Sequence, residues 1–126
     1  MAERKGLAVV DDEPEIQRMV QEHLDIQNLH HLILLQGFNS GESFIAFFRN
    51  HPSDINAVLM DGMLGRMNGV VAAKLARDID PNLTIIGCTD HTKFQVGFAR
   101  LGVNLIVPKS SLYSMLSCIV DLALSS

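Results

Sequence analysis

The sequence predicts one α/β domain built on a parallel sheet, because three features of the chain agree. Short apolar runs that are typical of buried strands alternate five times with segments of helical periodicity. No Pro-, Gly- or Ser-rich linker separates them, and 126 residues are enough for one hydrophobic core. The runs are mostly apolar throughout, as in strands covered by helices on both faces. We therefore expect residues 1–126 to form a single domain.

Each predicted strand is short and rich in aliphatic residues. The five strands are expected at Leu7–Val10, His31–Leu35, Ala57–Met60, Leu83–Cys88 and Leu105–Val107. Five helices are expected between and after them: residues 14–24, 40–51, 68–80, 92–101 and 111–126. Pro14 suits a first helical turn, Asn68 is a candidate N-cap, and Gly102 is a typical C-terminal stop.

Five successive strand and helix pairs leave few sensible topologies. Crossovers between parallel strands are right-handed, and the commonest open sheet built from such units has the strand order 2-1-3-4-5. The sequence therefore predicts a flavodoxin-like (βα)5 three-layer sandwich with five parallel strands. In such sheets, ligands bind at the carboxyl ends of the strands, beside the point where the strand order reverses.

Polar residues follow four of the five predicted strands. Asp11 and Asp12 follow the first strand, Asp61 the third, Thr89 the fourth and Lys109 the fifth. Because the carboxyl ends of parallel strands meet at one edge of the sheet, we expect these five side chains to converge there.

Three carboxylates without a neighbouring Cys or His form a hard oxygen site that suits Mg²⁺. A shared divalent ion would also explain why Asp11 and Asp12 can lie beside Asp61. Asp61 can then act as a nucleophile that receives a phosphoryl group, with Lys109 supplying positive charge and Thr89 a hydroxyl donor.

Composition excludes several other functions. The net charge of −4 and the pI near 5.6 give no general attraction to nucleic acid, so we expect no direct nucleic acid binding. The longest apolar runs fall far short of the roughly 20 residues that span a bilayer, and the N-terminus does not resemble a signal peptide. We expect a cytoplasmic protein with no membrane contact, in which Cys88 and Cys118 are buried free thiols.

Four segments, VVDDEP, VLMDGMLGRMNGV, IIGCTD and LIVPKS, resemble the signature segments of a two-component response-regulator receiver domain, in order and at family spacing. The resemblance covers essentially the whole chain. It implies that Asp61 is the phosphoacceptor and that Asp11, Asp12, Asp61 and the backbone carbonyl of Met63 hold Mg²⁺. It also implies that Thr89 and Lys109 bind the phosphoryl group.

The same resemblance implies a signalling phosphoacceptor instead of a turnover enzyme. The expected phosphodonor is a sensor histidine kinase or a histidine phosphotransfer protein. The expected target is a downstream output domain or protein, which would recognise the face formed by the fourth helix and fifth strand, around Ile106. A homodimer is one assembly open to such a domain.

The chain departs from the family pattern at four positions. Gly65 stands where Pro is common, and Ser110 follows Lys109 where Pro is usual. Asp90 replaces a small residue after Thr89, and we expect this acid to repel a phosphoryl group unless it turns to solvent. Ile106 replaces an aromatic residue that often signals activation.

Three alternatives remain open. Asp12 and Glu13 could only cap the first helix, where the macrodipole favours acids. The chain could be a receiver-like interaction module that no longer accepts phosphate. It could also be a Mg²⁺-dependent aspartyl-phosphate hydrolase, although Met63 occupies the place where such enzymes usually carry a second acid.

Overall fold

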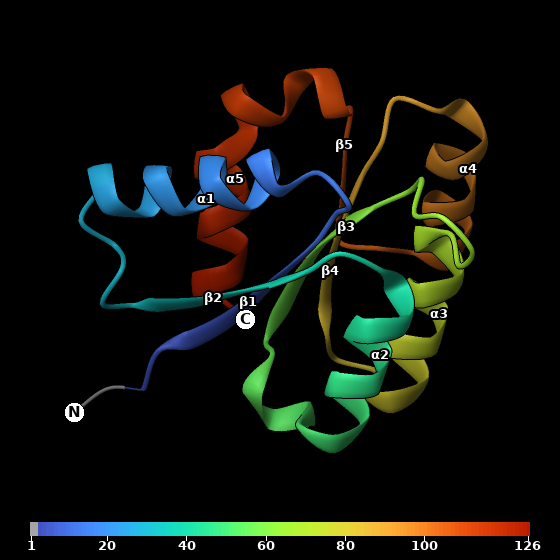
Figure 1. Ribbon diagram of the computed structural model, residues 1–126, viewed down its shortest axis with the longest axis horizontal. Coiled ribbons are helices and arrows are strands. Elements are labelled where there is room, and N and C mark those ends of the chain that lie inside the picture. Colours follow the sequence, from blue (N-terminus) through green and yellow to red (C-terminus); the bar gives the residue numbers. More distant parts are fainter. Residues whose placement is uncertain (1–2) are drawn as a thin grey trace.

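A computed structural model describes residues 3–126 of the chain and places five parallel strands in one sheet (Figure 1). The strand order is β2-β1-β3-β4-β5, which confirms the predicted topology. The strands are β1 (Lys5–Val10), β2 (Ile33–Phe38), β3 (Ala57–Asp61), β4 (Thr84–Cys88) and β5 (Leu105–Val107).

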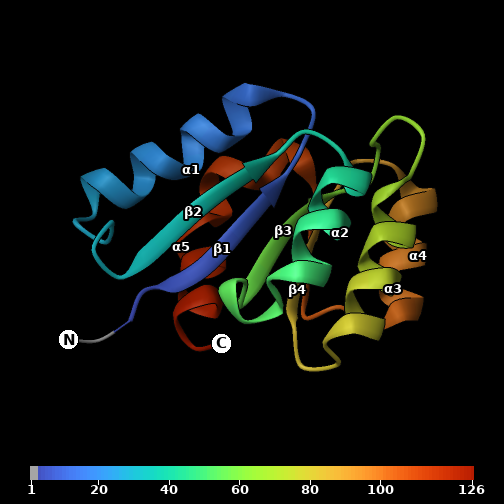
Figure 2. The ribbon, with the colours of Figure 1, turned by 60° about the horizontal axis from the view of Figure 1, so that its bottom comes forward.

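Five helices cover the two faces of this sheet. They are α1 (Pro14–Ile26), α2 (Gly41–Asn50), α3 (Gly69–Ile79), α4 (Thr92–Leu101) and α5 (Leu112–Leu124), with short 3₁₀ turns η1 (Pro52–Asp54) and η2 (Lys109–Ser111). Helices α1 and α5 lie on one face, and α2, α3 and α4 lie on the other (Figures 1 and 2). Among the described residues, no helix combines the length and the apolar character needed to cross a bilayer.

The sheet separates two hydrophobic clusters. Leu7 and Val9 of β1 pack among α1 and α5, whereas Ala8 and Val10 pack among α2, α3 and α4. The side chains of a strand alternate between faces, so an apolar run such as this fills both clusters at once. The position of β1 in the sheet, between β2 and β3, is consistent with that burial.

The helix boundaries follow local chemistry that the sequence displays. Pro14 opens α1, and the Ser40 side chain accepts a hydrogen bond from the Ser43 amide at 3.1 Å. The Asn68 side chain accepts from the Val71 amide at 3.0 Å, which confirms it as the N-cap of α3. Helix α4 ends at Leu101 as predicted, and Gly102, with φ of 74°, is its C-cap.

Strand β2 differs from its prediction, which placed it at His31–Leu35. The chain leaves α1 through a compact turn in which the Leu29 amide donates to the Leu24 carbonyl at 2.8 Å, so His31 still belongs to the turn. At its other end β2 continues through Gly37 to Phe38, which pairs with Val10 of β1. The edge strand therefore begins later and runs further than its apolar residues indicate.

The thiols also differ from their prediction. Cys88 in β4 is buried as expected, but Cys118 is exposed. Helix α5 turns Leu116, Ile119 and Val120 inward and leaves residue 118 on the outer side. Burial raises the pKa of Cys88 to about 12, and the charge of Asp61 adds to the effect.

Two glycines shape the connection from β3 to α3. A methyl group at Gly69 would lie 1.8 Å from the backbone oxygen of Asp61, so the start of α3 contacts the end of β3 directly. Gly65 has φ of +45°, a conformation that glycine adopts readily, and nothing lies within 4 Å of a methyl group built there. This backbone geometry accounts for Gly65 at a position where the resemblance leads one to expect Pro.

We predict that Gly69→Ala lowers the free energy of unfolding by about 3 kcal/mol, because the clash is with backbone that cannot rotate away. Gly65→Ala, which meets only the conformational cost of a positive φ, should lose about 1 kcal/mol. Urea denaturation measures both values. An equal or smaller loss for Gly69→Ala would show that α3 is free to move away from β3.

We also predict that a thiol reagent modifies Cys118 in the folded protein at a rate similar to that of an exposed model thiol, and leaves Cys88 unmodified until the protein unfolds. Peptide mapping by mass spectrometry after timed labelling measures each site. In Cys118→Ser, the folded protein should take up no label; rapid labelling of that variant would contradict the burial of Cys88.

Candidate functional site

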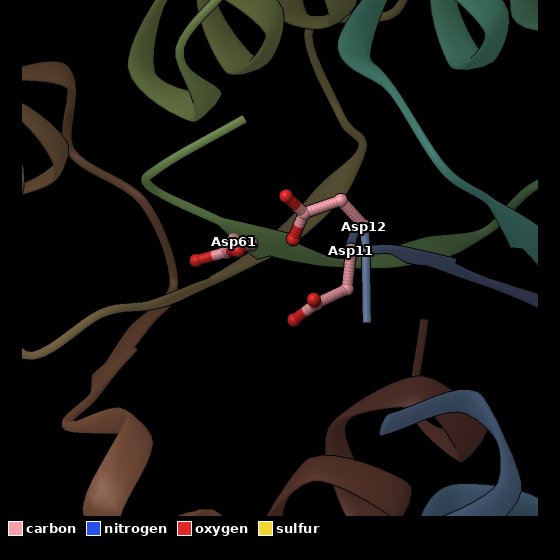
Figure 3. Close-up of side chains that lie close together, drawn as sticks. All are labelled: Asp11, Asp12 and Asp61. Carbon is pink, nitrogen blue, oxygen red and sulfur yellow. The ribbon is translucent and has the colours of Figure 1, made fainter. Parts of the chain in front are cut away.

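The three predicted acids meet at the carboxyl edge of the sheet. Asp11 and Asp12 directly follow β1, and Asp61 ends the adjacent strand β3, whose Met60 pairs with Val10. Each acid offers a carboxylate oxygen, and these three atoms lie within 4.8 Å of one another (Figure 3). The pairing of β1 with β3 thus gathers acids that are some fifty positions apart in the sequence.

Lys109 brings one positive charge to these acids. Its Nζ lies 3.1 Å from Asp11 Oδ2, 3.2 Å from Asp61 Oδ2 and 3.0 Å from Glu13 Oε1. The side chains of Asp11 and Asp61 are each 5% exposed, so the attraction acts where water screens it weakly. The ammonium group therefore offsets part of the repulsion among the acids.

Backbone amides fix how the two buried carboxylates point. Asp11 Oδ1 accepts a hydrogen bond from the Glu13 amide at 2.9 Å, and Asp61 Oδ1 accepts one from the Met63 amide at 3.3 Å. The second oxygen of each group faces Lys109. Each carboxylate is thus held by one backbone donor and by the shared ammonium group.

The buried acids are harder to ionise than ordinary carboxyl groups. Burial raises the pKa of Asp11, and the nearby charge of Asp61 raises it further. Burial also raises the pKa of Asp61, although Lys109 opposes this. Partial burial would lower the pKa of Lys109, but its hydrogen bonds to Glu13 and Asp11 and the charge of Asp61 raise it above its usual range.

Thr89 is buried directly after β4. Its Oγ1 accepts a hydrogen bond from the His91 amide at 3.1 Å, and its carbonyl accepts one from Gln95 Nε2 of α4 at 3.0 Å. Thr89 and the site share a pocket of about 270 Å³. This pocket is lined by Asp12, Glu13, Asp61, Met63, Gly65, Thr89, Asp90, His91 and Lys109.

The remaining predicted residues lie near this pocket in different ways. Met63 lines it and its side chain is 50% exposed. Ile106 lies in β5, is partly buried, and packs against the cluster formed with α2, α3 and α4. Ile106 is therefore not among the residues that line the pocket.

Two features of the site were not anticipated. Glu13 was considered only as a helix cap, but its side chain makes no capping hydrogen bond and contacts Lys109 instead. Asp90 is exposed, and its Oδ1 accepts hydrogen bonds from both the amide and the hydroxyl of Ser110 at 3.1 Å. The adjacent acid in DDE and the serine after Lys109 were the available signals, but neither fixes a partner.

The donor set fits Mg²⁺. The three clustered groups are all carboxylates, which hard cations prefer. A divalent charge would stabilise their ionised forms and so offset the desolvation and repulsion that raise the pKa of Asp11 and Asp61. Asp12 is exposed, so the cluster is open to solvent on one side and leaves room for water or phosphate oxygens.

Solved structures of receiver domains and response regulators share this fold. The receiver domain of NtrX from Brucella abortus has a TM-score of 0.78 at 20% identity, over 95% of this chain and 98% of that one. A putative response regulator from Chloroflexus aurantiacus has a TM-score of 0.79 at 19% identity, over 98% of this chain and 100% of that one. A CheY-like receiver domain protein from Methanospirillum hungatei has a TM-score of 0.76 at 17% identity, over 98% and 100%.

Among curated proteins, no relative matches the sequence. The family model described as the response regulator receiver domain matches residues 7–119, a span that runs from β1 into α5 and contains every residue of the site. The chain therefore belongs to the response regulator receiver domain family.

Proposed function

We propose that the chain accepts a phosphoryl group on Asp61 with the help of Mg²⁺ and acts as a switch in a two-component phosphorelay. The observation that supports this most directly is the contact between Lys109 Nζ and Asp61 Oδ2 at 3.2 Å, beside the carboxylate cluster. Among residues 3–126, Asp61 is the acid that combines a contact with Lys109, membership of the carboxylate cluster and a position in the wall of the pocket that Thr89 shares.

The proposed reaction is a displacement at phosphorus. A carboxylate oxygen of Asp61 attacks the phosphohistidine of a sensor kinase or phosphotransfer protein, and an acyl phosphate forms as the P–N bond breaks. The histidine nitrogen keeps the bonding electrons and takes a proton from solvent. Mg²⁺, held by Asp11, Asp12, Asp61 and the carbonyl of Met63, would supply positive charge to the phosphoryl oxygens.

Lys109 and Thr89 would contact the product. The Lys109 ammonium can donate to a phosphoryl oxygen in place of one of its three carboxylate partners. The Thr89 hydroxyl acts as an acceptor toward His91, so its own proton is available to a phosphoryl oxygen. Both residues thus offer donors to the added group: Lys109 from contacts that it already makes at the site, and Thr89 by a shift toward it.

The hydrogen bond from Gln95 to the Thr89 carbonyl gives the switch a route to α4. A shift of Thr89 toward the phosphoryl group would pull on this bond and change the face that α4 and β5 present, including Ile106. We propose that a downstream output domain or protein binds this face. We also propose that the receiver domain works in the cytoplasm.

The two alternative functions receive less support. A hydrolase needs a proton donor beside the leaving group, and the thioether of Met63 cannot donate one. An inert module needs no cation among its acids, yet Lys109 contacts three of them.

We predict that incubation with Mg²⁺ and acetyl phosphate adds one phosphoryl group, because Asp61 lies in the carboxylate cluster, contacts Lys109 and lines the pocket. Intact-protein mass spectrometry measures the gain. Asp61→Asn should abolish it, and excess chelator should reduce it to background. Asp78→Asn, which changes an exposed acid on α3, is the matched control and should behave as the parent.

The same experiment distinguishes the alternatives. Rapid release of inorganic phosphate without a stable mass gain would favour a hydrolase. The absence of both mass gain and phosphate release, in protein shown by circular dichroism to be folded, would contradict the proposed function.

We further predict that Asp61→Asn raises the free energy of unfolding in metal-free buffer by about 1 kcal/mol, because burial makes the ionised carboxylate costly to the folded protein despite its contact with Lys109. The folded protein holds the pKa of Asp61 above its unfolded value, so this cost is present at neutral pH, declines as the pH falls through the folded pKa and vanishes below the unfolded pKa. The difference from the parent should therefore narrow in acid.

Urea denaturation with chelator and with Mg²⁺ measures this effect. Added Mg²⁺ should stabilise the parent more than Asp61→Asn, because the variant offers the ion one carboxylate fewer. Equal stabilisation of the two proteins would exclude Asp61 as a ligand.

A further inference from the structure

We propose that Asp90 is a positioning residue that holds the Lys109 turn in place. This inference rests on the proposed function, in which Lys109 binds the phosphoryl group. Asp90 Oδ1 accepts hydrogen bonds from the Ser110 amide and from Ser110 Oγ, both at 3.1 Å. Ser110 directly follows Lys109, so a single carboxylate oxygen of Asp90 restrains the backbone beside the lysine.

The turn also has hydrogen bonds of its own, among them one from the Leu112 amide to the Lys109 carbonyl. Lys109 begins η2, a 3₁₀ turn of three residues that has no side-chain cap of its own. The Ser111 amide donates to the Pro108 carbonyl at 2.8 Å, which closes the turn. The Ser110 amide takes no part in this hydrogen bond. It donates instead to the Asp90 carboxylate.

Asp90 also extends the pairing of two strands beyond the sheet. The last backbone hydrogen bond between the β4 and β5 segments runs from the Thr89 amide to the Val107 carbonyl at 3.0 Å. The two segments then separate. The hydrogen bond between Asp90, the residue after Thr89, and Ser110, the residue after Lys109, connects them again. Lys109 therefore lies between two fixed points, Val107 and Ser110.

The Asp90 carboxylate is stabilised in its ionised form by its hydrogen bonds with Ser110. Hydrogen bonding from the Ser110 amide lowers the pKa of Asp90, so the contact favours the ionised carboxylate. Asp90 lines the same pocket as Asp61 and Lys109. A simple electrostatic view makes it a source of repulsion to the incoming phosphoryl group, whereas the geometry makes it a support for the lysine.

These two roles predict opposite effects of substitution. If Asp90 supports Lys109, Asp90→Ala slows phosphorylation by acetyl phosphate about tenfold, since displacing a positioned group by a fraction of an ångström reduces rate steeply. Asp90→Asn keeps an oxygen acceptor and restores most of the rate. If Asp90 mainly repels phosphate, both variants speed the reaction, and that result overturns the proposal.

Lys109 must mediate the effect. In a Lys109→Met background, Asp90→Ala should have no further effect on the rate, because the group that it positions is gone. Equal slowing by Asp90→Ala with and without Lys109 overturns the proposal. Ser110→Ala, which removes one of the two hydrogen bonds, should slow the reaction about threefold, and adding it to Asp90→Ala should cost nothing more.

A measurement without phosphate separates this inference from the proposed function. Hydrogen exchange of the Ser110 amide, followed by NMR in the unphosphorylated protein, should accelerate on the order of tenfold in Asp90→Ala and stay near the parent rate in Asp90→Asn. Unchanged exchange in Asp90→Ala overturns the contact, whatever Asp61 does. If the exchange changes as expected but the parent takes up no phosphoryl group, the proposed function fails, and the role of Asp90 in phosphoryl binding fails with it.

Asp121→Ala is the matched control for these experiments. It removes an exposed acid from α5, outside the pocket, and so reproduces the change in net charge and the loss of a surface carboxylate. Its phosphorylation rate and Ser110 exchange should equal those of the parent.

Discussion

The carboxylate cluster at the end of the sheet is the constraint on which the arrangement of this domain depends. Two unit charges about 4 Å apart repel by roughly 4 kcal/mol at the effective dielectric of a protein surface. The burial of Asp11 and Asp61 adds a desolvation cost, which is why the pKa of each lies above its usual value. The fold holds these groups together because β1 and β3 are central neighbours, and it offsets the cost with the single ammonium of Lys109.

The sequence was sufficient where burial on both faces of a strand makes the pattern unmistakable. Strands β1, β3 and β4 are almost wholly buried, and their apolar runs predicted the central strands. The strand order followed from the right-handed crossover rule for successive strand and helix pairs. The edge strand β2 was misplaced because its exposed positions include Gly37, and because backbone hydrogen bonds that no pattern reveals close the preceding turn. Cys118 was misjudged because apolar neighbours in sequence do not say which side of α5 a residue occupies.

The site divides in the same way. The positions of Asp11, Asp61 and Lys109 follow from strand ends, so a topology was enough to bring them together. The contact of Glu13 with Lys109 and that of Asp90 with Ser110 depend on side-chain direction across separate loops. Glu13 and Lys109 are 96 positions apart in the sequence, and Asp90 and Ser110 are 20 positions apart. Spacing alone cannot select such partners.

The two proposed phosphoryl contacts differ in how they are held, and this difference suits a switch. Lys109 is held by three carboxylates, and Asp90 contacts the next residue, so the lysine would be in place before a phosphoryl group arrived. Thr89 is tied instead to the start of α4, through His91 and Gln95. A phosphoryl group that draws on both residues would find one already positioned and would have to move the other. The free energy of the new contacts would then mainly favour a shift of Thr89, the residue that is hydrogen-bonded to α4.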